Sequence, residues 1–116
     1  MKLDMLYVPV QNIQGSLAFY RDYLGLEEAG REGDTTVIFN LPGIDVKLMI
    51  DQHGEHIATT PGPLFMLPSV DEFYAQQRDN MAFVQEPIDI PIGRWAAAKD
   101  PTGNTIYFVD MSRSTP

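Results

Sequence analysis

Cysteine is absent from this 116-residue sequence, and histidine occurs only twice. Without cysteine the chain can form no disulfide bond, no thiolate nucleophile and no cysteine-based zinc or iron–sulfur site. Basic residues are also scarce, since eight lysines and arginines stand against 16 aspartates and glutamates and leave a net charge of −8. That charge argues against nucleic acid and anionic membranes as partners, and it favours a cationic ligand.

Long hydrophobic runs are missing as well, because no continuous apolar stretch reaches the length of a secretory signal or a membrane span. No glycine-rich phosphate loop follows a predicted strand, and no serine lies in a recognisable nucleophile turn, so a nucleotide enzyme or hydrolase finds no support. Hydrophobic residues make up 44% of the chain, which is enough for one packed core. We therefore predict a single cytoplasmic domain over residues 1–116, with no membrane partner.

The chain does contain a pattern of strands and helices that occurs twice. In the first half, Asn12 can cap a helix whose apolar stripe runs from Ile13 to Leu24. In the second half, Ser69 is followed three residues later by Glu72, which is a capping box. The predicted strands cover residues 3–10, 27–32, 35–39 and 46–50 in the first half, and 64–67, 83–85, 94–99 and 105–109 in the second.

The two halves can be superimposed in sequence. The pair Phe19-Tyr20 in the first predicted helix corresponds to Phe73-Tyr74 in the second. We predict an α+β fold of two tandem βαβββ modules, one over about residues 1–52 and one over about 63–111, joined by a crossover at 53–62. Such modules are too small to bury a sheet alone, so they are expected to share a core, either within one chain or by exchange between two.

Two segments resemble the vicinal-oxygen-chelate superfamily, which includes glyoxalase I, extradiol dioxygenases and bleomycin-resistance proteins. Residues 16–26, SLAFYRDYLGL, resemble its helix-to-strand segment, and residues 100–107, DPTGNTIY, resemble its last turn and strand. With the repeat, the length and Trp95, the resemblance covers about residues 3–110. It implies the glyoxalase/bleomycin-resistance fold, in which two βαβββ units curl into mixed sheets around a cup, and it implies a homodimer.

Metal-dependent members of this superfamily place histidine and glutamate ligands on the concave face, two from each unit. The resemblance puts the four ligand positions at Met5, at Lys47, within residues 61–63 and at Tyr107. A thioether, an ammonium and a phenol do not hold zinc, nickel or iron(II) in these roles. The resemblance therefore implies no metal and no cofactor, and it is closest in type to the metal-free, bleomycin-resistance-like members.

Strand alternation predicts which side chains line the cup. Met5 and Tyr7 share one face of the first strand, Lys47 and Met49 share a face of the strand at 46–50, and Tyr107 faces inward from the last strand. The resulting lining is apolar and aromatic with one cation, as is typical of a small-molecule pocket. The alternative is that the methionines and Tyr107 are ordinary core between two sheets.

Lys47 and Trp95 each allow two interpretations. Inside a cup, Lys47 would need a carboxylate such as Asp45 or an anionic ligand, whereas at the rim of an edge strand it would reach water. Trp95, the single tryptophan, could stack on a planar ligand or pack in the core or in a dimer interface. The predicted ligand-binding residues are Met5, Tyr7, Lys47, Met49, Trp95 and Tyr107.

The two histidines, His53 and His56, flank Glu55 in the glycine-containing crossover. The sequence brings no third ligand near them, so we interpret this segment as a solvated loop rather than a metal site.

Three classes of function are compatible with these features. The first is a metal-independent protein that binds a small, planar, cationic molecule such as an antibiotic and sequesters it. The second is an enzyme of the same superfamily with an atypical site. It is either a metal-dependent lyase or dioxygenase whose ligands lie at other positions, or a metal-independent relative in which Lys47 or Tyr107 acts as acid, base or anion clamp. The third is a protein that works mainly through its dimer contacts. Fold analogy does not choose among them, and we favour the first.

Overall fold

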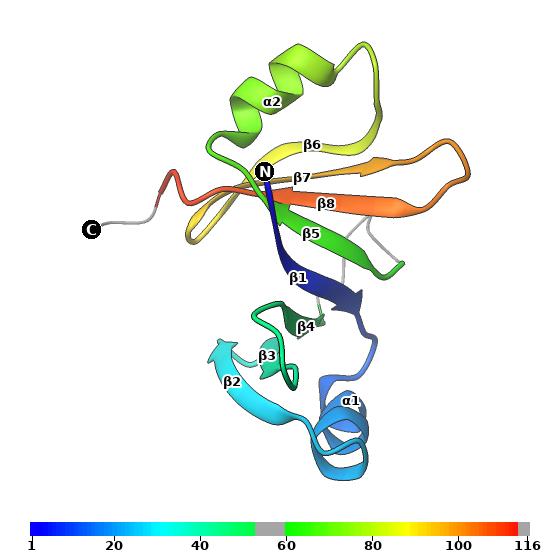
Figure 1. Ribbon diagram of the computed structural model, residues 1–116, viewed down its shortest axis with the longest axis vertical. Coiled ribbons are helices and arrows are strands. Elements are labelled where there is room, and N and C mark those ends of the chain that lie inside the picture. Colours follow the sequence, from blue (N-terminus) through cyan, green and yellow to red (C-terminus); the bar gives the residue numbers. More distant parts are fainter. Residues whose placement is uncertain (53–59, 114–116) are drawn as a thin grey trace.

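The computed structural model describes residues 1–52 and 60–113, which form one curled sheet and short helical segments (Figure 1). The elements of the first half are β1 (Lys2–Pro9), α1 (Ile13–Leu17), the π-helix η1 (Ala18–Tyr23), β2 (Glu27–Glu32), β3 (Thr36–Asn40) and β4 (Lys47–Asp51). Those of the second half are β5 (Gly62–Met66), α2 (Val70–Gln77), β6 (Ala82–Ile90), β7 (Gly93–Lys99) and β8 (Thr105–Val109).

The eight strands lie in the order β2-β3-β4-β1-β5-β8-β7-β6. Within each half the first strand runs parallel to the last, as β1 does to β4 and β5 to β8, and the other two pairs are antiparallel. The halves meet where β1 pairs antiparallel with β5 in the same chain. This order confirms the predicted α+β fold of two βαβββ units, and the joint sheet forms within one chain.

Side-chain alternation divides the interior into three clusters. One lies between α1 and the first half of the sheet, around Val37, Phe39 and Ile50. A second lies between α2 and the second half, where Phe108 is buried. The third cluster contains Tyr7, Leu64, Trp95, Ala97, Tyr107 and Val109 and belongs to the opposite, concave face of the sheet. Because residues two apart share a face, Tyr107 and Val109 face the cup while Phe108 packs under α2.

Both predicted helix starts are confirmed. The side chain of Asn12 accepts a hydrogen bond from the backbone N–H of Gly15 at 3.1 Å, and that of Ser69 accepts one from Glu72 at 3.1 Å. The first helix differs from its prediction after Leu17, because it widens into η1, where the N–H of Leu24 bonds to the carbonyl of Phe19, five residues back. The wider turn rotates Leu24 off the apolar stripe, and its side chain is 57% exposed.

Strand β6 is much longer than the predicted 83–85. It continues past Pro87 to Ile90 as the last strand of the sheet, with irregular register to β7 between Phe83 and Ile88. Proline lacks a backbone N–H and is tolerated at a sheet edge or a bulge, so its presence did not end the strand. Most of the predicted crossover at 53–62, including His53 and His56, lies outside the described residues. Within the described residues, no helix has the length and hydrophobicity needed to cross a membrane.

Asp110 joins three segments of the second half at the end of β8. Its carboxylate accepts hydrogen bonds from the backbone N–H of Val70 at 2.7 Å, of Arg94 at 2.8 Å and of Ser112 at 3.0 Å, and from the Ser112 hydroxyl at 2.7 Å. Burial raises the pKa of this carboxyl group, but these donors outweigh burial and bring its pKa below the ordinary value. One buried carboxylate therefore accepts hydrogen bonds from three segments: the start of α2, the start of β7 and the residues after β8.

The turn between β7 and β8 is organised in a similar way by Asp100. Its carboxylate accepts hydrogen bonds from the backbone N–H groups of Thr102 at 3.0 Å and Asn104 at 2.8 Å, and also from both side chains. The Asn104 amide is the largest cause of a pKa lowered to about 2 for Asp100. The hydrogen bonds of this turn thus stabilise the ionised form of Asp100.

Asp100→Asn is expected to lower stability at neutral pH, with an effect that fades in acid. The pKa of Asp100 is lowered on folding, so its contribution is present above the unfolded-state pKa of about 3.9. It is lost as the pH falls from that value through about 2. The difference between the urea midpoints of the two proteins, measured from pH 7 to pH 2.5, should shrink progressively below about pH 4. A difference that stays constant down to pH 2.5 would contradict this assignment.

Candidate ligand-binding site

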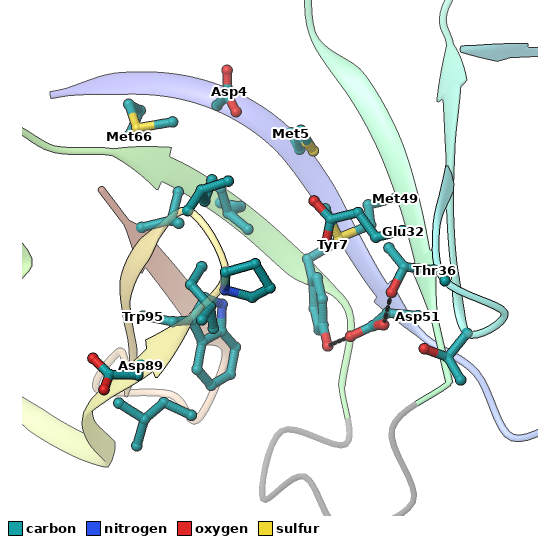
Figure 2. A pocket seen from close by; sticks show the side chains of 18 residues that line it. Asp4, Met5, Tyr7, Glu32, Thr36, Met49, Asp51, Met66, Asp89 and Trp95 are labelled. Carbon is teal, nitrogen blue, oxygen red and sulfur yellow. Dashed lines mark hydrogen bonds between the residues drawn. The ribbon is translucent and has the colours of Figure 1, made fainter. Parts of the chain in front are cut away.

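A cavity of about 500 Å³ opens on the concave face of the sheet. Both halves contribute to it: β1 and β4 with the β2–β3 turn from the first, and β5, the β6–β7 hairpin and β8 from the second (Figure 2). The described residues that line it are Asp4, Met5, Tyr7, Glu32, Gly33, Thr35, Thr36, Met49, Asp51, Leu64, Met66, Ile88, Asp89, Ile90, Pro91, Ile92, Trp95 and Val109. Its volume lies within the range of pockets that bind small molecules.

The wall of this cavity combines flexible apolar side chains with charges of one sign. Three methionines, Met5, Met49 and Met66, contribute to it, and methionine adapts its shape to a ligand. The four charged side chains among the described lining residues are all carboxylates, namely Asp4, Glu32, Asp51 and Asp89. The cavity is therefore suited to an apolar molecule that carries positive charge.

Three aromatic rings pack together at the inner end of the cavity. The ring centroids of Tyr7 and Tyr107 are 4.6 Å apart, and Trp95 stacks on Tyr107 at 5.4 Å with an interplanar angle of 27°. Trp95 and Tyr7 line the cavity, whereas Tyr107 is fully buried beside them. The Tyr107 hydroxyl donates to the backbone carbonyl of Thr60, and burial raises the pKa of Tyr107 to about 12. Tyr107 thus supports the other two rings and keeps its proton at neutral pH.

Asp51 is the buried charge of the cavity, with only 4% of its surface exposed. The hydroxyl of Tyr7 donates to one carboxylate oxygen, and the hydroxyl of Thr36 donates to the other at 2.5 Å, as the dashed lines in Figure 2 show. Burial raises the pKa of Tyr7 well above its ordinary value, and the adjacent Asp51 raises it further. Tyr7 therefore remains a hydrogen-bond donor to this carboxylate.

The sequence analysis missed Asp51, Thr36 and Asp4. Asp51 continues the alternation of Lys47 and Met49 by one step, but the predicted strand ended at residue 50, so this signal was lost. Asp4 lies at a register irregularity between β1 and β5, where Leu3 pairs with Phe65 and Met5 with Leu64. Such bulges redirect side chains, and no local pattern in the sequence marks this one.

The six predicted binding residues have different locations. Met5, Tyr7, Met49 and Trp95 line the cavity, and Tyr107 packs behind two of them. Lys47 is not among the described lining residues. Its Nζ donates to the Asn40 side chain on the neighbouring strand at 2.8 Å, and the pairing with Asp45 that the sequence suggested is not the contact formed. Asn40 and Lys47 are paired in register between β3 and β4, which explains the contact.

The positions at which the resemblance would put metal ligands do not fit a metal ion. Met5 offers a thioether, Lys47 a cation that bonds to Asn40, and Tyr107 a phenol that donates to Thr60. Such groups do not form a site for a divalent ion. Across residues 1–52 and 60–113, no three histidine, cysteine, aspartate or glutamate side chains are grouped so that they could hold one.

Comparison with known proteins gives one family and a set of similar structures. The family model described as the Glyoxalase/Bleomycin resistance protein/Dioxygenase superfamily matches residues 2–108. No match was found among curated protein sequences.

Three solved structures illustrate the structural likeness. A protein from Legionella pneumophila described as an NAD-dependent benzaldehyde dehydrogenase is 20% identical, with a TM-score of 0.77 over 93% of this chain and 98% of that one. Methylmalonyl-CoA epimerase from Mycobacterium tuberculosis is 18% identical, with a TM-score of 0.65 over 96% and 88%. A superfamily member from Vibrio splendidus 12B01 is 16% identical, with a TM-score of 0.64 over 91% and 96%. At these identities the likeness shows the fold.

Proposed function

Because the chain belongs to the glyoxalase/bleomycin resistance protein/dioxygenase superfamily, whose fold offers a cup between two βαβββ units, we propose that it binds and sequesters a small molecule there without a metal. The ligand is planar, apolar over most of its surface and positively charged, as some antibiotics are. The observation that carries this proposal is the cavity of about 500 Å³, in which methionines and Trp95 form the wall and the described charges are carboxylates.

The lining supports a flat aromatic ligand in particular. Trp95 is held by its stacking on Tyr107, so its position is fixed before a ligand arrives. A fixed aromatic surface lowers the entropy lost on binding, and Met5, Met49 and Met66 can adjust to the remaining outline of the ligand. The carboxylates add attraction for a cation, including the charge–aromatic contact that tryptophan favours.

A planar cation such as 9-aminoacridine is expected to raise the melting temperature of the protein. At about a hundredfold excess over Kd, binding adds about 2.7 kcal/mol to stability, which is several degrees for a domain of this size. The shift should persist after dialysis against EDTA, because no metal takes part. Differential scanning fluorimetry checks both points. If 9-aminoacridine and a panel of planar cationic antibiotics leave the melting temperature unchanged, or if EDTA abolishes the shift, the proposal fails.

Two substitutions locate the binding site. Trp95→Phe should weaken binding by about tenfold, because phenylalanine offers a smaller ring and a weaker cation–π contact. Phe65→Leu serves as the matched control. Phe65 belongs to the cluster under α2, on the other face of the sheet, so this change should leave the affinity within about twofold of wild type.

The contact between Tyr7 and Asp51 supports a second candidate, an enzyme of the same superfamily with an atypical site. A carboxylate in an apolar cavity can take a proton from a bound substrate, and the hydroxyls of Tyr7 and Thr36 would hold it in place. Mass spectrometry distinguishes the two functions, because a sequestered ligand is recovered unchanged after prolonged incubation and a substrate is not.

We propose that the protein forms a homodimer. Phe19, Tyr23 and Leu24 follow one another closely along the first helical segment, and their side chains are 53%, 81% and 57% exposed. Exposed apolar side chains gathered in this way are typical of an interface between proteins. Light scattering should give twice the chain mass of 13.0 kDa, and Tyr23→Asp should reduce it to the monomer value. A wild-type protein of monomer mass would refute the dimer.

A further inference from the structure

The tip of the β6–β7 hairpin forms one wall of the cavity. The residues from Ile88 to Ile92 all line it, and three of them are isoleucines. Ile88 is paired with Trp95 and Ile90 with Gly93 across the hairpin, so both isoleucines lie on the concave face, where they pack on the third cluster. A ligand in the cavity therefore meets this hairpin through aliphatic side chains.

Arg94 holds the same hairpin from the face of the sheet that α2 covers. Its guanidinium donates to the Asp89 carboxylate at 3.1 Å and to the backbone carbonyl of Pro87 at 3.1 Å, both on β6, and to the Asp71 carboxylate on α2 at 3.0 Å. Asp89 and Arg94 are paired in register, so they share the face opposite to the isoleucines. One side chain thus connects the edge strand of the hairpin to the helix.

The contacts of Arg94 form a network rather than an isolated ion pair. Its side chain is 28% exposed, and three of its nitrogen atoms bond to three separate acceptors, which suits the rigid fork of a guanidinium. An isolated surface ion pair contributes little, whereas several charges held in one geometry contribute more.

The residues after β8 add a second connection to the hairpin tip. Arg113 forms an ion pair with the other oxygen of Asp89 at 3.4 Å, and its backbone N–H donates to the carbonyl of Ile92 at 3.0 Å. The Arg113 side chain is 52% exposed, so its ion pair is screened by water and is the weaker of the two. Arg94 is therefore the principal side chain that holds the hairpin in place.

The position of the hairpin matters because apolar contact depends steeply on distance. A gap of 0.5–1 Å between two surfaces already loses about a quarter to a half of their dispersion attraction. Arg94 itself is not among the described residues that line the cavity. Its effect on a ligand is therefore transmitted through the isoleucines on the other face of the hairpin.

Resting on the proposed function, we propose that Arg94 is a positioning residue of the ligand site: it holds the β6–β7 hairpin at the distance at which Ile88, Ile90 and Ile92 contact the bound molecule. The proposal gives a part in binding to the opposite face of the sheet, where the side chain touches α2 and no ligand.

Hydrogen exchange measured by mass spectrometry tests whether Arg94 holds the hairpin. Arg94→Met keeps the aliphatic stem and removes the donors, so the amides of residues 88–93 should exchange about fivefold faster than in wild type. Exchange in β8 should stay within about twofold of wild type, which separates local loosening from a general loss of stability. Arg94→Lys should lie between the two, because lysine keeps the charge but has no rigid fork.

Arg78→Met is the matched control. Arg78 lies over the ring of Tyr74 on α2, with its guanidinium carbon 5.6 Å from the ring centroid. This change also removes one positive charge near the same helix, but it touches no contact of the hairpin. Exchange of residues 88–93 should therefore match wild type.

A double-mutant cycle tests whether the hairpin transmits the effect to the ligand. Ile90→Ala should weaken 9-aminoacridine binding about tenfold in the wild-type background, because apolar contact is lost. In the Arg94→Met background the same change should cost no more than about threefold, since Ile90 is no longer held against the ligand. Loss of Arg94 also leaves Asp89 more attractive to a cation, but both Arg94→Met proteins share this change, so it cancels in the comparison. Isothermal titration calorimetry gives the four affinities.

The outcomes separate this proposal from the proposed function. A tenfold cost of Ile90→Ala in both backgrounds, no cost in wild type, or unchanged exchange in the hairpin overturns the role of Arg94 and leaves sequestration intact. If 9-aminoacridine does not bind the wild-type protein, sequestration of this cation fails, and the exchange experiment still decides whether Arg94 holds the hairpin. Circular dichroism checks folding, and Arg94→Lys takes the place of Arg94→Met in both experiments if the latter does not fold.

Discussion

Replacing Asp110 with alanine is expected to lower the free energy of unfolding by about 4 kcal/mol, because the buried N–H of Val70 and the half-buried N–H of Arg94 lose their acceptor. Asp110 is 1% exposed, and its carboxylate accepts hydrogen bonds from the backbone of Val70 and Arg94 and from both donors of Ser112. Each buried N–H left without an acceptor costs about 1–3 kcal/mol, and bonds to a charged group lie at the upper end. The total is a large fraction of the 5–15 kcal/mol that typically stabilises a domain.

Urea denaturation measures this loss directly, and Ser112→Ala provides the comparison. That substitution removes one hydroxyl donor and leaves the carboxylate with its backbone partners, so it should cost less than about 1.5 kcal/mol. Asp110→Ala protein within about 1 kcal/mol of wild type would show that the carboxylate does not hold the three segments together.

The second large effect is expected for Gly62→Ala. An added Cβ at residue 62 would lie 2.0 Å from the backbone oxygen of Thr105 and 3.3 Å from a ring carbon of Tyr107. Neither atom is the end of a flexible side chain, so β5 and β8 would have to separate. Forcing atoms into a packed interior costs about 1–3 kcal/mol and sometimes more, and a backbone contact this short belongs at the upper limit.

The consequence reaches the ligand site, because Gly62 pairs with Tyr7 across the junction of the two halves. Separation of β5 from β8 would disturb the packing of Tyr7 on Tyr107, so Gly62→Ala protein that still folds should also bind 9-aminoacridine less tightly. Gly30→Ala is the control, since an added Cβ there meets no atom within 4 Å. Comparable urea midpoints for the two variants would refute the close approach of β5 and β8.

Much of the fold could be predicted because it depends on local signals. Asn12 and Ser69 mark helix starts through their side-chain oxygens, and period-two alternation marks most strands. The same alternation placed Met5 and Met49 on the concave face, where they line the cavity. These patterns depend only on residues that are close together in the sequence, so a single sequence is enough to detect them.

The features that could not be predicted depend on contacts between distant residues. The bulge near Asp4 exists only in the pairing of β1 with β5, and the bond of Lys47 to Asn40 requires the register of β3 on β4. Asp51 itself continues the alternation of Lys47 and Met49, but its contacts with Thr36 and Tyr7 could not be predicted, because these residues lie 15 and 44 positions away in sequence. Side-chain chemistry near strand ends is decided by such partners, which composition and spacing do not reveal.

Strands β1 and β5 meet at the centre of the sheet, so each of the two repeats contributes its own residues to the cavity. The first contributes the acidic and hydroxyl groups around Asp51, and the second contributes Trp95 and the isoleucines of the β6–β7 hairpin. Substitutions in the first repeat can thus alter charge preference while Trp95 in the second repeat is unchanged. The ligand preference of such a protein can therefore change through substitutions in one repeat at a time.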